Sequence, residues 1–266
     1  ILAQVERAPF LRPLAPIAPR GASARAWEMR HRLQRFLDMG DDDAPSMLVS
    51  PSLELLAGRL QDFAASRPQG ASALVPLCGK SRDLVFLSEL GCRVVGVEIS
   101  RRIIAKFADE QGLDLVQGDS DGAGGGMATW FAGDCSICEG DWFDATPEAL
   151  GGTFDLAYDC AALTAVDPAR RSAYSDVLRG LLKPSGWAVV VALEFDEASV
   201  DSSLLALGPH SLSEAELRGL FPDFEVELVE ETPGADEVCR KLREAGLQSV
   251  THRTFLLRRV SATWSS

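Results

Sequence analysis

The feature that most constrains this chain is an apolar run that ends in the turn Pro76–Ser81 and is followed by Glu98, nineteen residues after Gly79. A second apolar run, 94–97, leads directly to Glu98. This pattern predicts a strand, a helix and a parallel strand that carries a carboxylate at its tip. A carboxylate in that position can accept hydrogen bonds from both hydroxyls of a ribose, so the unit predicts a nucleoside-type ligand.

The same alternation of strands and helices continues along the chain, which predicts a doubly wound α/β fold with ligands at the carboxyl ends of the strands. The expected strands are 73–77, 93–97, 135–138, 153–158, 187–193, 224–229 and 254–260. The expected helices are 27–36, 51–65, 81–90, 100–111, 167–183, 213–221 and 236–245, with a Gly-rich surface loop at 118–126. Ser100 is expected to cap one helix and Ser213 with Glu216 to form a capping box.

Charge and cysteine usage narrow the function. The formal net charge of −13 disfavours partners such as nucleic acid or anionic membrane surfaces. No apolar run approaches the ~18 residues that a membrane span requires. The six cysteines are scattered as in a reduced intracellular protein, and Cys135 and Cys138 would point to opposite faces of one strand, so no metal is expected.

The first 26 residues differ from the rest because they are rich in Pro, Ala and Arg, and the run 7–26 contains no acid after Glu6. Two interpretations remain open, a disordered arm or the remnant of an organellar targeting segment. The first predicts a cytoplasmic protein and the second an organellar one. The folded domain is expected to span 27–266, with a helical lid at 27–66 and a sheet core at 72–260.

The single glycine of the turn separates two classes of cofactor. A dinucleotide usually needs Gly-x-Gly-x-x-Gly, whereas Gly79 follows the bulky Leu77 and Cys78. S-adenosylmethionine has no phosphates and suits this turn better. Asp141 could accept from its adenine amino group, and Trp142 could cover the adenine ring.

At this point the chain resembles a known family. The motifs 76–81, 94–100 and 141–144, together with 154–159 and Ala162-Leu163, are similar to those of the thiopurine S-methyltransferase family. The resemblance runs from about Leu74 to Leu257 and implies a seven-stranded Rossmann-like methyltransferase sheet beneath an N-terminal helical lid. The expected cofactor-binding residues are Trp27, Leu77, Gly79, Glu98, Ile99, Asp141, Trp142 and Cys160.

One departure concerns the substrate. Members of the family commonly carry Asp-Arg after the fourth strand, whereas this chain carries Asp159-Cys160. The chain therefore lacks a fixed bidentate cation that would recognise an anionic, thiopurine-like substrate.

The resulting hypothesis is methyl transfer from S-adenosylmethionine to sulfur in a small-molecule thiol or thioether, for example a methylthio-hydroxy acid. The protein then aligns the reactants and excludes water. Asp159 and His210 are the predicted catalytic residues, with Glu194 as another proton acceptor. Three alternatives stay open: a halide methyltransferase, a non-catalytic binding module and, less favoured, a nicotinamide-dependent oxidoreductase. Arg170 and Arg171 are expected on a solvated helix face, and the sequence leaves the choice between monomer and dimer open.

Overall fold

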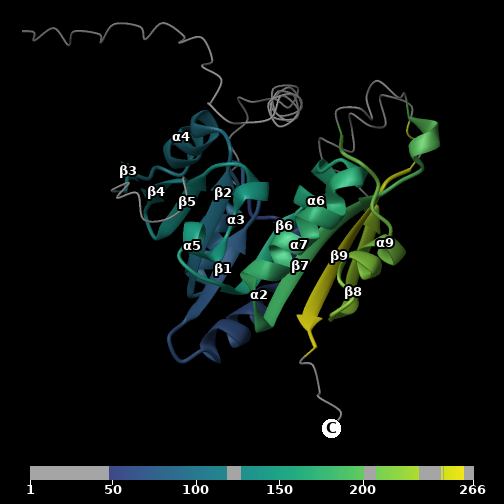
Figure 1. Ribbon diagram of the computed structural model, residues 1–266, viewed down its shortest axis with the longest axis horizontal. Coiled ribbons are helices and arrows are strands. Elements are labelled where there is room, and N and C mark those ends of the chain that lie inside the picture. The colour runs from purple at the N-terminus through teal and green to yellow at the C-terminus, as the bar shows by residue number, and fades with distance from the viewer. Residues whose placement is uncertain (1–47, 119–126, 201–207, 234–246, 248, 261–266) are drawn as a thin grey trace, which may run out of the picture.

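The computed structural model describes residues 48–118, 127–200, 208–233, 247 and 249–260 (Figure 1). The predicted N-terminal arm, the first lid helix with Trp27, most of the Gly-rich loop and the predicted helix 236–245 lie outside the described residues.

The described strands form one sheet of nine, in the order β3-β4-β5-β2-β1-β6-β7-β9-β8. They are β1 (Ala71–Val75), β2 (Cys92–Glu98), β3 (Leu115–Gln117), β4 (Ala128–Ala132), β5 (Cys135–Glu139), β6 (Phe154–Cys160), β7 (Leu182–Glu194), β8 (Phe224–Pro233) and β9 (Thr251–Arg259). The five strands β5, β2, β1, β6 and β7 are parallel, and β9 and β8 close one edge in antiparallel pairing.

The expectation of seven strands is corrected to nine. The seven strands from β5 to β8 in the sheet order are the seven that were expected. The additional strands are β3 and β4, which pair antiparallel with each other and extend the sheet beyond β5. β3 has only three residues, none of them buried, so no alternation of apolar and polar residues predicted this strand. The strand 187–193 is also longer than expected, because β7 begins at Leu182 where the preceding helix ends.

Helices cover both faces of the sheet (Figure 1). On one face, α2 (Pro51–Ala65), α3 (Asp83–Glu89) and α4 (Arg101–Glu110) share a core with β1, β2 and β6. On the other face lie α5 (Pro147–Leu150), α6 (Ala162–Ala165), α7 (Arg171–Leu181) and α9 (Glu214–Leu220). Three short 3₁₀ helices lie in the connections: η1 (Trp142–Asp144), η2 (Pro168–Arg170) and η3 (Glu197–Ser199). The part of the expected lid that is described, α2, therefore packs into the core through Leu53, Leu56 and Leu60.

Two local expectations can be compared directly. Ser213 accepts from the Glu216 amide at 3.2 Å, which confirms one half of the capping box. Ser100 precedes α4 but its side chain makes no capping bond, so that expectation was wrong. The Ser100 amide donates to Glu98 at 2.7 Å, which ties the start of α4 to the end of β2.

Cys135 and Cys138 belong to different hydrophobic cores on the two faces of β5, as their spacing predicted. Within the described ranges no group of His, Cys, Asp or Glu is arranged to hold a metal ion. Over the same residues, no helix is long and apolar enough to cross a membrane.

Candidate functional site at the carboxyl edge of the sheet

The turn after β1 is strained in a way that shapes a ligand site. Leu77 has φ 46° and Gly79 has φ 56°, both in the left-handed region, which is unfavourable for a leucine. The turn lies against β2: the Cys78 amide donates to the Val97 carbonyl at 3.0 Å. Gly96 of β2 makes this approach possible, because a Cβ there would lie 2.6 Å from Sγ of Cys78.

Glu98 ends β2 and ties the turn to the sheet edge. Its Oε2 accepts from the Gly79 amide at 3.1 Å and its Oε1 from the Ser100 amide at 2.7 Å. The side chain is 4% exposed, and burial raises the pKa of Glu98 although backbone amides, including that of Ile99, counteract the shift. A carboxylate offers about four acceptor positions, so two remain for ribose hydroxyls.

Asp141 and Trp142 follow β5, which pairs with β2. The Gly140 amide donates to the Glu98 carbonyl at 3.0 Å, and Asp141 then caps η1 by accepting from the Phe143 amide at 3.1 Å. Trp142 is 3% exposed and packs on Tyr174 with ring centroids 5.1 Å apart. Its buried Nε1–H has no hydrogen-bond partner within the described part of the chain.

Asp159 lies near the end of β6 and is fully buried. Its Oδ2 accepts from the Tyr174 hydroxyl at 2.7 Å and its Oδ1 from the Leu163 amide at 3.1 Å. Burial raises the pKa of Asp159 to about 6, against the lowering effect of these donors. Because Tyr174 also packs on Trp142, one chain of contacts connects the end of β6 with η1.

Cys160 faces a polar cluster that sequence reasoning missed. Cys160 is an exposed residue whose Sγ lies 4.0 Å from the Ser50 hydroxyl, and the Ser50 amide donates to Oδ1 of the buried Asp83 at 2.7 Å. Burial of the Cys160 thiol and, to a smaller extent, the charge of Asp83 raise the pKa of Cys160 to about 12. Burial also raises the pKa of Asp83 and, strongly, that of Tyr158 beside it. No local motif marked Asp83, because α2 brings its partner from 33 positions away.

Ala161, the next residue, has φ 61°. The two non-glycine residues with positive φ in the described chain, Leu77 and Ala161, thus follow the adjacent strands β1 and β6 at the same sheet edge. Backbone strain of this kind clusters at functional sites.

His210 is brought to this region by its amide, which donates to the Thr164 carbonyl of α6 at 2.7 Å. Its imidazole is half-buried, with Nδ1 3.9 Å from Glu197. Burial lowers the pKa of His210, and Arg171 adds to this effect while Glu197 opposes it.

The expectation that Arg170 and Arg171 are solvated is wrong for Arg171, which is 1% exposed. Its guanidinium donates to the Ser211 carbonyl at 2.9 Å, the His210 carbonyl at 3.1 Å and Glu216 at 2.9 Å. Arg170 lies over the Phe143 ring at 3.6 Å. The helix pattern could not reveal these partners because the chain supplies them from about 40 residues downstream.

The carboxyl edge therefore brings together Leu77, Gly79, Glu98, Ile99, Asp141, Trp142, Asp159, Cys160 and His210 from the turns after β1, β2, β5, β6 and β7. Glu194, the other acceptor considered, forms a close ion pair with Arg253. The buried Glu98 carboxylate, the strained Leu77 turn and the unpartnered Nε1–H of Trp142 fit an adenosyl ligand.

Solved structures define the class of fold. The chain is similar to the 1,6-didemethyltoxoflavin-N1-methyltransferase of Burkholderia thailandensis, solved with S-adenosylhomocysteine, with a TM-score of 0.55, 18% identity and coverage of 92% of this chain and 94% of that one. It is also similar to an S-adenosylmethionine-dependent methyltransferase from Anabaena variabilis, with a TM-score of 0.53, 18% identity and coverage of 94% and 100%. The fold is that of S-adenosylmethionine-dependent methyltransferases.

The family follows from the sequence itself. The family model for thiopurine S-methyltransferase (TPMT) matches residues 54–260. A thiopurine S-methyltransferase of Pseudomonas putida is 37% identical over 211 residues, which cover 79% of this chain and 90% of the relative. A probable thiopurine S-methyltransferase of Yarrowia lipolytica is 32% identical, covering 68% and 80%. The chain belongs to the thiopurine S-methyltransferase family and is an S-adenosylmethionine-dependent methyltransferase.

Proposed function

We propose that the protein transfers the methyl group of S-adenosylmethionine to sulfur in a small-molecule thiol or thioether. The observation that carries the proposal is the buried Glu98 carboxylate, bonded to the Gly79 and Ser100 amides at the edge where parallel strands end. Membership of the family supports sulfur as the acceptor atom.

Residues of the turns after β1, β2 and β5 would hold the cofactor, which supplies an activated methyl group on a sulfonium. Glu98 would accept from the ribose hydroxyls, and the backbone at Leu77 and Gly79 would approach the ligand closely. Asp141 would accept from the adenine amino group, with Ile99 beside the ring. Trp142 is 3% exposed and its indole Nε1–H is buried as well, so we propose that it supports the adenine side of the site from within the core and does not cover the ring.

The substrate would lie over the end of β6, beside the Tyr158 hydroxyl and the Cys160 thiol. Burial keeps the Tyr158 hydroxyl protonated, and the pKa of about 12 keeps the Cys160 thiol uncharged at neutral pH. Such surroundings favour a soft, polarisable nucleophile of low charge over an anionic one. A thiol or a thioether satisfies this requirement.

A thiol must lose its proton before or during transfer. His210 is the proposed acceptor, because its lowered pKa leaves it neutral near pH 7 and α6 holds its backbone close to the end of β6. Asp159 has no exposed surface and both of its oxygens accept internal bonds. We therefore propose that Asp159 positions α6 and Tyr174 and does not touch the substrate.

The test begins with calorimetric titration of S-adenosylmethionine and S-adenosylhomocysteine into the wild-type protein and Glu98→Gln. We expect Glu98→Gln to weaken binding about 100-fold, because a buried charged acceptor is worth roughly 1.5–3 kcal/mol. Glu225→Gln is the matched control, since Glu225 is exposed on β8 at the opposite edge of the sheet. Equal binding by wild type and Glu98→Gln would overturn the cofactor site.

Transfer of a labelled methyl group to a panel of thiols, thioethers and iodide then tests the acceptor. Turnover with thiols that falls in His210→Gln while cofactor affinity stays constant supports the mechanism. Turnover with iodide alone would make the protein a halide methyltransferase. Cofactor binding without turnover on any acceptor would contradict the proposal and leave a binding module.

A further inference from the structure

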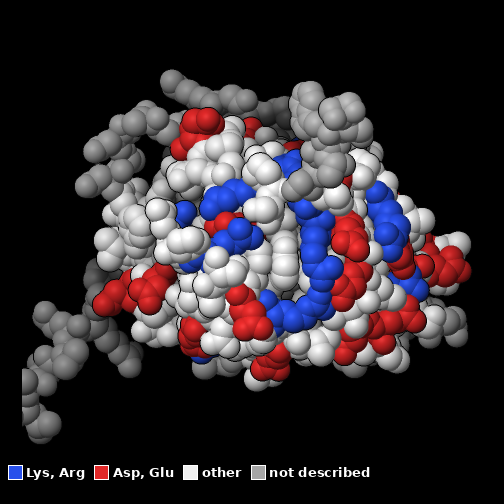
Figure 2. Space-filling model, turned by 90° about the horizontal axis from the view of Figure 1, so that it is seen from below, with Lys and Arg blue, Asp and Glu red and all other residues white. Residues whose placement is uncertain are grey.

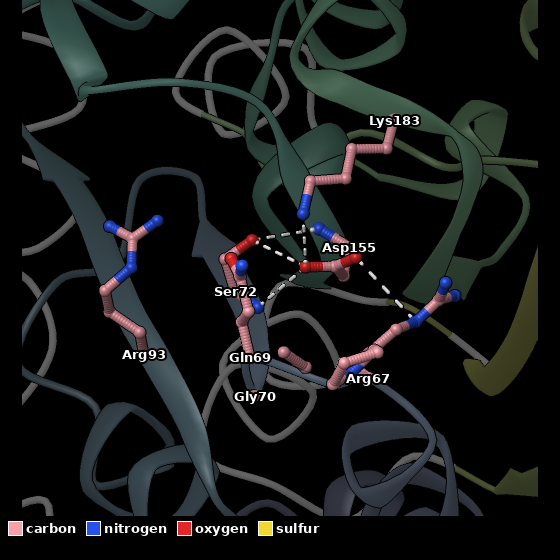
Figure 3. Close-up of a pocket in the computed structure, with 9 residues that line it drawn as sticks. Arg67, Gln69, Gly70, Ser72, Arg93, Asp155 and Lys183 are labelled. Carbon is pink, nitrogen blue, oxygen red and sulfur yellow. Dashed lines mark hydrogen bonds and ion pairs between the residues drawn. The ribbon is translucent and has the colours of Figure 1, made fainter.

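The opposite, amino edge of the sheet carries a hollow of about 430 Å³ that has no part in the proposed methyl transfer. It is lined by residues 67–72 between α2 and β1, by Arg93 of β2, Asp155 of β6 and Lys183 of β7. Figure 2 views the molecule from this end, below Figure 1, and Figure 3 shows the hollow from close by. The parallel strands begin here, so the hollow and the carboxyl edge lie at opposite ends of the same strands.

The lining has a clear excess of positive charge. It holds the three cations Arg67, Arg93 and Lys183 against one acid, Asp155, in a chain whose formal net charge is −13. Lys183 donates to Oδ2 of Asp155 at 2.7 Å, and Nε of Arg67 lies 3.7 Å from Oδ1. One carboxylate thus faces two cations while Arg93 stands apart (Figure 3).

The strand register places Arg93 in a row with Ser72 and Asp155. Ser72 pairs with Arg93 across β1 and β2, and Ser72 also donates to Asp155 of β6 through both its amide and its hydroxyl, at 3.0 and 2.9 Å. The three side chains therefore form a row on one face, with the small serine in the middle. Two strand spacings, about 10 Å, separate Arg93 from Asp155, and the Asp155 carboxylate already accepts from Lys183 and Ser72.

The groups that line the hollow are available to a ligand. Arg93 is exposed and forms no ion pair or hydrogen bond with any described residue, and the exposed Gln69 lies beside it in the lining. Lys183 has a side chain that is 41% exposed, so it can donate a second bond outward. Arg67 contributes charge from a fixed position, because its Nε is buried and its two terminal nitrogens donate to the Ser185 hydroxyl and carbonyl at 3.3 and 3.2 Å. Arg93 has no anion beside it, and Arg67 and Lys183 share the single carboxylate of Asp155. Positive charge in such an arrangement suits an oxyanion.

We propose that this hollow binds an oxyanion, the phosphate or carboxylate group of a small molecule, over Ser72 and between Arg93 and Lys183. Arg93 supplies a planar fork that matches either group, and Lys183 supplies a second charge from the far side of the row. The site is separate from the adenosyl site, because it lies where the strands begin. Oxyanion and S-adenosylhomocysteine therefore bind together without competition.

The test uses calorimetric titration of inorganic phosphate, and separately of malonate, into the full chain saturated with S-adenosylhomocysteine, with chloride holding the ionic strength constant. We expect binding of at least one of the two, weakened about tenfold or more in Arg93→Gln, because a charge-assisted contact is lost. Arg93→Lys keeps the charge and should retain part of the affinity. Arg218→Gln is the matched control, an exposed arginine on α9 paired with Glu214.

Binding of phosphate alone would assign the site to phosphorylated ligands, and binding of malonate as well would include carboxylates; each supports the proposal. Three outcomes would overturn it: neither anion binds, Arg93→Gln binds as well as Arg218→Gln, or S-adenosylhomocysteine displaces the anion. Arg93 is exposed and unpaired, so Arg93→Gln should fold, and an unchanged unfolding midpoint verifies this.

Discussion

Asp155 and Asp159 stand at the two ends of the same strand, β6, and are 4% and 0% exposed. Burial by itself raises the pKa of both carboxyls. At Asp155 the bond from Lys183 and the two donors of Ser72 reverse the shift, so the pKa is lowered. At Asp159 the donors are the neutral Tyr174 hydroxyl and backbone amides, so the pKa stays raised at about 6.

The carboxyl with a cation among its partners has a lowered pKa, whereas the carboxyl that lies deeper in the protein and has neutral donors alone keeps a raised pKa. At the amino edge, the charge of Asp155 is therefore balanced by its partners. At the carboxyl edge, ionisation of the buried Asp159 lowers the stability of the fold. Costly groups and strained backbone coincide at the edge assigned to methyl transfer, as is common for functional sites.

The largest expected effect is on the pH dependence of stability through Asp159. The unfolded carboxyl loses its proton near pH 4 and the folded one near pH 6, so the folded state holds more protons in between. The free energy of unfolding should therefore fall by about 3 kcal/mol between pH 4 and pH 6 on account of this group. In Asp159→Asn this part of the fall should vanish, as urea unfolding at stepped pH would show; parallel curves for the two proteins would contradict the assignment.

Asp155→Asn should show the opposite sign. The lowered pKa of Asp155 means that its contribution to stability is present above its ordinary pKa and is lost as the pH falls through the folded value. We expect the variant to lose about 2 kcal/mol at pH 7 and to approach the wild type below pH 4. Lys183→Gln should reproduce this pattern because it removes the cation, and a deficit that stays constant with pH would break the comparison.

A smaller effect separates two glycines. Gly79→Ala places a side chain at φ 56° and should cost about 1–2 kcal/mol. It should also weaken S-adenosylhomocysteine binding, since the Gly79 amide meets Glu98. Gly58→Ala is the matched control: Gly58 lies exposed within α2 with open space around it, so the change should stabilise by about 0.5–1 kcal/mol and leave binding unchanged. Similar losses of stability in both variants would remove the argument for a strained turn.

The smallest effect is chemical. Because its pKa is about 12, Cys160 should react with iodoacetamide at pH 7.5 on the order of a hundredfold more slowly than an ordinary cysteine, whose pKa is about 8.5, since the greater nucleophilicity of the more basic thiolate offsets part of its scarcity. Asp83→Asn should speed the reaction, because the Asp83 charge contributes to the shift. Peptide mapping by mass spectrometry gives the rate. Rapid labelling of Cys160 in the native protein would show that its surroundings do not hold the thiol neutral.

Local signals in the sequence were enough to predict the site's framework. The turn at Gly79 and the carboxylate at Glu98 belong to a single βαβ unit, so their spacing alone placed them together. The same holds for Asp141, whose strand pairs directly with β2. The short strand β3 was missed because none of its three residues is buried, and without β3 the pairing of β4 could not be predicted.

What the sequence by itself determined is the class of fold and the family, and it predicted the edge for the cofactor site, because parallel strands end at one edge and each motif lies within one strand and its turn. Only the tertiary structure decided which charges are compensated. Arg171 is buried by carbonyls about 40 residues away, Cys160 meets Ser50 across 110 positions, and Asp155 bonds to Ser72 and Lys183, whereas the Arg93 side chain has no partner among the described residues. Such contacts depend on strand order and register, which no local pattern records.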